Sequence, residues 1–290
     1  MSLPPSTTAQ PSTATQEQGL VGMPAEYCWS YRPLAGARKL VISLSAHREF
    51  ILEDEQFASS RIDIADRRNS YYTFRPGAAC RRLLDLVDRR GYRQLMFVGP
   101  SKGGFGALLW AAKTAQFRPD LNVHCLAFSP QTRIFPTNDR LLFRSYQELL
   151  NRIQKDSVAR RDAENWGDLK TLVERQRRLR CTIVYGEQNG VDVLEANRLM
   201  GPHIRKVPVP IWFHASMLAF SPARADPQRW ARQLEKLYER AGTDDDLAAA
   251  LPANPQDIVD HFKYMDWIPT IDRMIEESFA IDVDGPALHP

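Results

Sequence analysis

Cysteine is scarce in this chain: there are four in 290 residues, and they form neither a C-x-x-C motif nor the mixed Cys/His pattern of a zinc site. Long apolar runs are missing as well, since no stretch of 18 or more apolar residues occurs, which excludes a membrane-spanning helix. Residues 1–20 are rich in Ser, Thr, Pro and Gln and lack the basic and apolar regions of a secretory signal. We therefore expect a disordered leader, a cytoplasmic protein, and no metal or cofactor.

Charge is unevenly distributed along the chain. The formal net charge is +3, but residues 244–290 hold 11 acidic and 2 basic side chains, leaving 36 basic and 24 acidic ones in residues 1–243. Solvated faces plus an acidic tail would explain this pattern. Alternatively, the tail folds back onto the basic body or binds a protein partner, or the basic body binds an anionic partner. We do not expect nucleic-acid binding, because no recognised binding motif accompanies the arginines.

Short apolar runs alternate with helical stretches, which predicts an α/β fold with a mainly parallel sheet covered by helices on both faces. We assign residues 21–242 to this domain, with a helical insert at 131–180 before the penultimate strand, and 243–290 to an acidic C-terminal extension. Predicted strands cover 27–31, 39–44, 61–65, 94–98, 122–128, 181–185 and 207–213. Predicted helices cover 76–90, 103–115, 227–241, 258–262 and 270–278.

One strand-to-helix junction has an unusual sequence. The apolar strand 94–98 runs into Gly99-Pro100-Ser101-Lys102-Gly103, and an Ala/Leu-rich helix follows directly. In the G-x-S-x-G motif the serine occupies a sharp turn that exposes its hydroxyl, and side chains at the flanking glycines would collide with neighbouring backbone. A phosphate-binding loop does not fit, because Ser101-Lys102 precede the second glycine instead of following it. A glycine-rich turn in another doubly wound fold is the alternative.

Two further positions fit the chain order that accompanies such a serine. His214 ends the apolar run 207–213, where the last strand would deliver a general base. Asp192 follows the strand 181–185 and is our choice for the acid that orients this base. Glu187 is the alternative acid, in which case Asp192 would only cap the following helix.

These segments together resemble the α/β hydrolases, from the strand near Lys39 to the helix ending near Ala241. More narrowly, the chain is similar to hydrolase-fold components of the bacterial accessory secretion system and to bacterial polysaccharide-linked hydrolases. These proteins carry a G-x-S-K-G-G elbow, matched at 99–104, and an Asp-x-x-Asn-x-Tyr-Tyr loop, matched at 66–72. The resemblance implies ester or acyl-group chemistry on a glycan or related polar substrate. The chain departs from it by its arginine-rich insert, its acidic tail and Asn189, where many hydrolases carry Asp.

An oxyanion hole needs two N–H donors, and by position we expect the backbone N–H groups of Lys102 and Ala46, the latter in the loop after strand 39–44. His47 beside it is a candidate substrate contact, or is simply exposed. Tyr71 and Tyr72 are candidates for stacking on a sugar, although two tyrosines after a strand are more often packing residues.

Three functions follow from these interpretations. The leading hypothesis is a serine esterase in which Ser101, His214 and Asp192 form an acyl-serine on a small-molecule or glycan ester, which water then releases. An acyltransferase would use the same residues with a hydroxyl acceptor in place of water. A non-catalytic binding or assembly protein is the third, favoured by the missing Asp at position 189.

Overall fold

A seven-stranded sheet forms the centre of the computed structural model, which describes residues 20–53 and 55–280. The strands are β1 (Tyr27–Arg32), β2 (Lys39–Leu44), β3 (Ser60–Asp66), β4 (Gln94–Pro100), β5 (Asn122–Phe128), β6 (Arg180–Gly186) and β7 (Ile204–Val209). Their order across the sheet is β1-β3-β2-β4-β5-β6-β7. Only β1 runs antiparallel to its neighbour; the other neighbouring pairs are parallel. The predicted mainly parallel sheet is confirmed.

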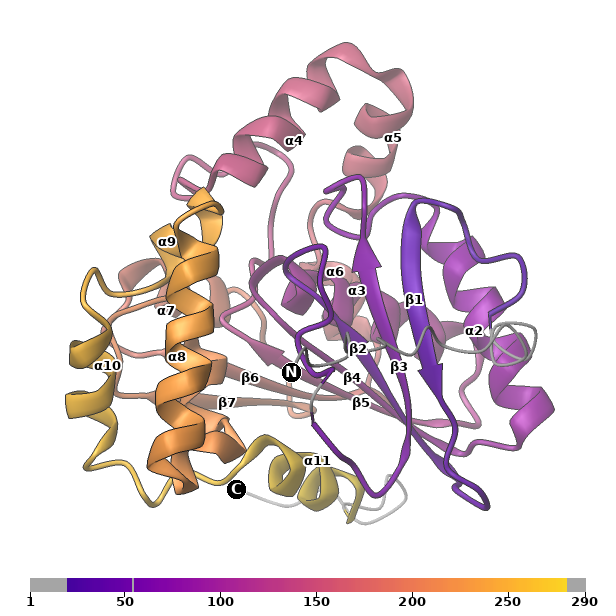
Figure 1. Cartoon of the computed structure of the whole chain (residues 1–290). Coiled ribbons are helices and arrows are strands. Elements are labelled where there is room, and N and C mark those ends of the chain that lie inside the picture. The colour runs from indigo at the N-terminus through magenta and orange to yellow at the C-terminus, as the bar shows by residue number, and fades with distance from the viewer. Residues whose placement is uncertain (1–19, 54, 281–290) are drawn as a thin grey trace, which may run out of the picture.

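Helices cover both faces of this sheet. They are α2 (Pro76–Arg90), α3 (Ser101–Phe117), α4 (Arg144–Lys155), α5 (Ser157–Trp166), α6 (Lys170–Arg175), α7 (Gly190–Asn197), α8 (Pro227–Ala241), α9 (Asp245–Ala250), α10 (Pro255–Phe262) and α11 (Ile271–Ala280), with 3-10 turns at Ser216–Phe220 and Pro222–Ala225. Helices α4–α6 form the predicted insert before the penultimate strand, and α4 and α5 project beyond the sheet (Figure 1).

Alternation along the strands divides the core into two layers. In β2, Leu40, Ile42 and Leu44 face the layer formed with α2, α3 and the insert, whereas Val41 faces the layer formed with α8–α11. This two-residue period is expected for a sheet buried on both sides. The acidic segment that follows α8 supplies apolar residues to the second layer: Ile258 of α10 and Ile275 of α11 are both fully buried.

The last strand differs from its prediction. We expected residues 207–213, but β7 spans Ile204–Val209 and pairs with β6 up to Val209 opposite Gly186. Proline has no N–H to continue a ladder at Pro210, and the chain turns there, with the Ile211 N–H donating to the carbonyl of Val209. His214 consequently lies on a loop beyond the strand, not at its end.

Two further expectations concern the predicted leader and the predicted absence of a membrane-spanning helix. The disordered leader predicted at residues 1–20 falls almost wholly outside the described residues. Among the helices that the structure does describe, none combines the length and the apolarity needed to cross a bilayer.

Candidate active site

The junction between β4 and α3 forms the sharp turn that the sequence predicts. Ser101 has a φ of 52°, in the left-handed region that non-glycine residues rarely adopt, and it is the first residue of α3. A Cβ on Gly99 would lie 2.5 Å from the carbonyl oxygen of Gly103, and one on Gly103 would lie 2.1 Å from that of Leu44. Both flanking positions therefore require glycine, for the reason given above.

Two other loops bring polar side chains to this turn. His214 Nε2 lies 2.9 Å from Ser101 Oγ, and His214 Nδ1 lies 2.6 Å from Asp192 Oδ1. Asp192 and His214 are 2% and 8% exposed, so both groups are shielded from water. Phe143, which precedes α4, packs against the His214 ring with the two ring centroids 4.8 Å apart, and it adds to this shielding. The three residues predicted from the sequence are thus brought together.

Asp192 lies in the first turn of α7 and does not cap this helix. The cap is Asn189, whose side-chain oxygen accepts from the N–H groups of Val191 and Asp192. The Asn189 amide also donates to the carbonyl of Trp212, which ties α7 to the loop that carries His214. Glu187, the alternative acid, is exposed to solvent before the helix. The geometry favours Asp192 over Glu187 as the partner of His214.

Sequence reasoning missed two residues that follow β5. Ser129, with a φ of 42°, donates a 2.6 Å hydrogen bond to Asp192 Oδ2 and lies 2.8 Å from Ser216 Oγ. Gln131 donates from Nε2 to Ser101 Oγ over 3.1 Å. The available signal was positional: both residues follow the strand next to β4, at the carboxyl edge of the parallel sheet, where sites of such folds lie.

The loop after β2 lies against the same turn. The carbonyl of Leu44 and the backbone carbon of Ser45 are the close neighbours of Gly103, and Ala46, 5% exposed, comes next along the chain. The predicted oxyanion donors Ala46 and Lys102 therefore belong to adjacent segments. Their roles stay predictions.

The two tyrosines do not face solvent. Tyr71 and Tyr72 are 1% and 0% exposed. Tyr72 donates to the carbonyl of Ser45 over 2.7 Å, and its ring stacks on that of Tyr27. Both tyrosines have positive φ angles, in a loop whose backbone donates to the Asp66 carboxylate. The burial favours the packing interpretation over stacking on a sugar, with Tyr72 supporting the loop that carries Ala46.

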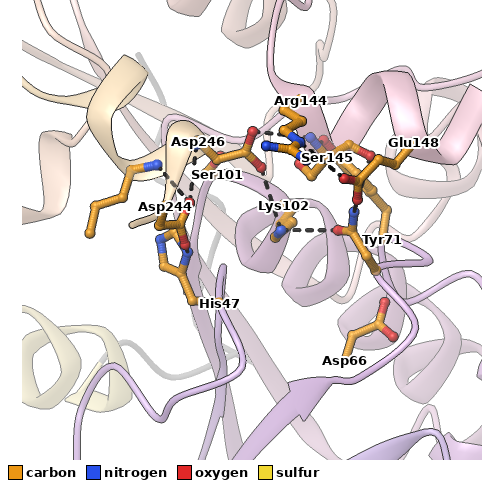
Figure 2. A network of polar contacts seen from close by, with 12 residues as sticks. His47, Asp66, Tyr71, Ser101, Lys102, Arg144, Ser145, Glu148, Asp244 and Asp246 are labelled. Atoms are coloured by element: carbon orange, nitrogen blue, oxygen red, sulfur yellow. Dashed lines mark hydrogen bonds and ion pairs between the residues drawn. The ribbon is translucent and has the colours of Figure 1, made fainter. Parts of the chain in front are cut away.

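A polar cavity of about 480 Å³ lies between the insert and α9, and Lys102 lines it next to the serine turn, whereas Ser101 and His214 are not among its lining residues. Lys102, the residue after Ser101, points into a network with Asn69 and the acidic start of α9 (Figure 2). Burial lowers the pKa of Lys102, and Asp246, 3.7 Å from its Nζ, partly offsets this effect. His47 also lines the cavity and pairs with Asp244 over 2.8 Å.

Within residues 20–53 and 55–280, the structure contains no group of three or more His, Cys, Asp or Glu side chains arranged to hold a metal ion.

Comparison of the sequence with protein-family models gives no match, and neither does comparison with curated proteins. Solved structures do match. An α/β-hydrolase enzyme from the metagenome of sediments of the Mar Chica lagoon, Morocco, is 13% identical, with a TM-score of 0.41, over 75% of this chain and 96% of that one. A hydrolase from Oleispira antarctica is 10% identical, with a TM-score of 0.42, over 64% and 87%. A lipase-esterase related protein from Clostridium acetobutylicum is 8% identical, with a TM-score of 0.41, over 66% and 93%.

Fold identity rests on the chain's own architecture. The sheet is parallel except at β1, the serine turn joins a central strand to a buried helix, and Asp192 and His214 follow the later strands. This chain has the α/β-hydrolase fold.

Proposed function

We propose that the chain is a serine hydrolase that cleaves carboxylic esters through an acyl-serine intermediate. The observation that carries this proposal is the continuous hydrogen-bonded series Ser101–His214–Asp192, with contacts of 2.9 and 2.6 Å, at the N-terminal end of α3. A serine hydroxyl becomes a useful nucleophile only when a base accepts its proton, and the base must be held in one tautomer by a third group. The positions of His214 and Asp192, both almost fully buried, support these two roles.

In the first step, Ser101 Oγ attacks the ester carbonyl while His214 Nε2 takes its proton. Asp192 accepts from Nδ1–H and stabilises the imidazolium that forms. The proton then passes to the leaving alkoxide, and the acyl group stays on Oγ. In the second step, water adds to this acyl group with His214 again acting as base, and the acid product leaves.

Negative charge that develops on the carbonyl oxygen needs fixed donors. We assign this role to the backbone N–H groups of Lys102 and Ala46, which lie on the two segments that meet at Gly103. Each such donor is worth roughly 3 kcal/mol of barrier. The N-terminus of α3, a helix of 17 residues, adds a positive dipole end at the same place.

Charged side chains line the cavity that reaches the serine turn at Lys102, and this lining supports a polar substrate over a long aliphatic ester. Among polar esters, the resemblance to polysaccharide-linked hydrolases favours a glycan ester. The argument for a non-catalytic protein loses its main support, because Asn189 has a structural task as the cap of α7 while Asp192 contacts the imidazole.

A fluorophosphonate probe tests the proposal directly. We expect the purified protein to be labelled, Ser101→Ala to be unlabelled, and short p-nitrophenyl esters to be hydrolysed only by the unsubstituted protein. Ser157→Ala is the matched control, since Ser157 is an exposed serine at the start of α5. Labelling that persists in Ser101→Ala, or no labelling together with no ester turnover, contradicts the proposal.

A further inference from the structure

Gln131 is a fourth residue that contacts the polar atoms of Ser101 and His214. Its Nε2 lies 3.1 Å from Ser101 Oγ and 3.3 Å from His214 Nε2, and the residue is 1% exposed. These two atoms are the ones between which a proton passes in the first step. A side-chain amide at this place therefore belongs to the immediate surroundings of the chemistry.

The segment around Gln131 is firmly held. Glu195 of α7 is 3% exposed, and its carboxylate accepts from the N–H and the hydroxyl of Thr132, both at 2.7 Å. The same carboxylate accepts from the Asn138 amide at 2.7 Å. Because Glu195 and Asp192 lie on the same short helix, Gln131 is positioned relative to the acid of the proposed site.

The polarity of Gln131 is not explained by packing. Its Oε1 is buried and has no hydrogen-bond partner within the described part of the chain. A buried acceptor without a partner is costly, and a methionine of similar size would fill the space without that cost. The amide therefore points to a role that uses its N–H group.

We propose that Gln131 is a further catalytic residue that positions the nucleophile of the second, acyl-releasing step; this inference rests on the proposed serine-hydrolase function. Once Oγ carries the acyl group, the attacking water must lie within hydrogen-bond distance of His214 Nε2 to give up its proton. The Gln131 amide lies beside that position and donates to a lone pair of the water oxygen, so that the other lone pair is directed at the acyl carbon.

Atoms and protons balance in this step. The water O–H bond breaks and its proton goes to His214 Nε2, while the oxygen forms a bond to the acyl carbon. The bond between that carbon and Oγ then breaks, and the proton on His214 returns to Oγ. Gln131 keeps its own protons throughout. In the free enzyme the same N–H donates to Ser101 Oγ, so its removal does not slow the first step.

Gln131→Met separates the two steps. We expect the rate of fluorophosphonate labelling, which reports only the first step, to equal or exceed that of the parent, and steady-state turnover of p-nitrophenyl acetate to fall about tenfold. A burst of p-nitrophenol should precede the slow phase, since the acyl-enzyme accumulates. Hydroxylamine, a stronger nucleophile than water, should speed turnover more in the variant than in the parent. Gln147→Met, an exposed glutamine on α4, is the matched control.

The outcomes are distinguishable. If labelling and turnover fall together without a burst, or if Gln131→Met matches the parent in every readout, Gln131 has no such role. Gln131→Glu, of equal size but without an N–H donor, decides the matter if the methionine variant does not fold, and should show the same burst. An unlabelled parent would overturn the serine-hydrolase function and this inference with it, whereas a labelled parent with an unaffected variant overturns the inference alone.

Discussion

Asp192 uses both of its carboxylate oxygens, one toward His214 Nδ1 and the other toward Ser129 Oγ. An acid held at both oxygens can neither rotate away from the imidazole nor collect a water molecule in its place. At the scale of single residues, the proposed site therefore depends on contacts that a change of one atom can remove.

Asp192→Asn is the variant that makes this change. We expect kcat for a p-nitrophenyl ester to fall about a thousandfold to ten-thousandfold, because an amide neither fixes the required tautomer nor stabilises the imidazolium. Glu187→Gln, at an exposed position, should keep parental activity. If activity is lost only in the Glu187 variant, Asp192 is not the acid. Steady-state kinetics on both proteins decides between them.

Gly103 is a second residue at which a change of one atom should have a large effect, in this case on stability. An added methyl group would meet the backbone carbonyl of Leu44 at 2.1 Å, and backbone cannot move aside as a flexible side chain can. We expect Gly103→Ala to lower the free energy of unfolding by about 3 kcal/mol. Gly190→Ala is the control, since a Cβ there meets nothing within 4 Å. Equal stability of the two variants in urea unfolding would contradict the close approach of β2 to the serine turn.

At the scale of elements, the contact between β5 and α11 carries a titratable group. His124 on β5 is 2% exposed, and its ring packs edge-on against Phe279 of α11. Burial, with a smaller contribution from Arg180, lowers the pKa of His124 from 6.5 to about 4. The folded state thus holds a neutral imidazole where the unfolded state takes up a proton.

The sign of the pH effect follows from this difference. Between pH 6.5 and about 4 the unfolded chain binds the extra proton, so the free energy of unfolding falls as the pH is lowered, by up to about 3 kcal/mol. His124→Leu cannot take up this proton and should show a shallower loss over the same range. Urea unfolding of both proteins from pH 7.5 to 4.5 measures the difference. Parallel curves would mean that His124 is not neutral in the folded state.

At the scale of the whole molecule, the uneven charge of the chain corresponds to contacts between distant segments. Three consecutive aspartates at the start of α9 and just before it pair with three separate segments: Asp244 with His47 in the loop after β2, Asp245 with Arg144 of α4, and Asp246 with Lys102 of α3. The hydrogen bond from His47 lowers the pKa of Asp244. These pairs connect the acidic segment to the wall of the cavity beside Ser101.

Replacing the three aspartates 244–246 by asparagine tests how much these pairs contribute. We expect a loss of about 1–2 kcal/mol in the free energy of unfolding at low ionic strength, because partly exposed pairs are individually weak. The difference from the parent should shrink at high salt, where the pairs are screened. Asp272→Asn, on the exposed side of α11, is the control and should have little effect. A loss that does not depend on salt would assign the stabilisation to hydrogen bonds of these side chains, such as that from the Ser145 N–H to Asp246, and not to their charge.

Much of this architecture was predictable from the sequence, because strand alternation, the glycines around Ser101 and the position of His214 are all local patterns. The errors have a common cause in non-local contacts. The extent of β7 is set by its pairing with β6, and Gln131 meets Ser101 across 30 residues of chain. The burial of Tyr71 and Tyr72 likewise depends on segments that are distant in the sequence. The periodicity within a segment does not indicate which distant segments contact it.

Helix α7 carries Asp192 toward His214 and, one turn later, Glu195 toward the segment of Gln131. Each residue in a helix turns the following ones by about 100°. Inserting or deleting a single residue between Asn189 and Asp192 would therefore swing both carboxylates off their partners at once. Changes of length here would remove two sides of the proposed site together. Homologous chains of differing length should thus keep the 189–195 spacing constant.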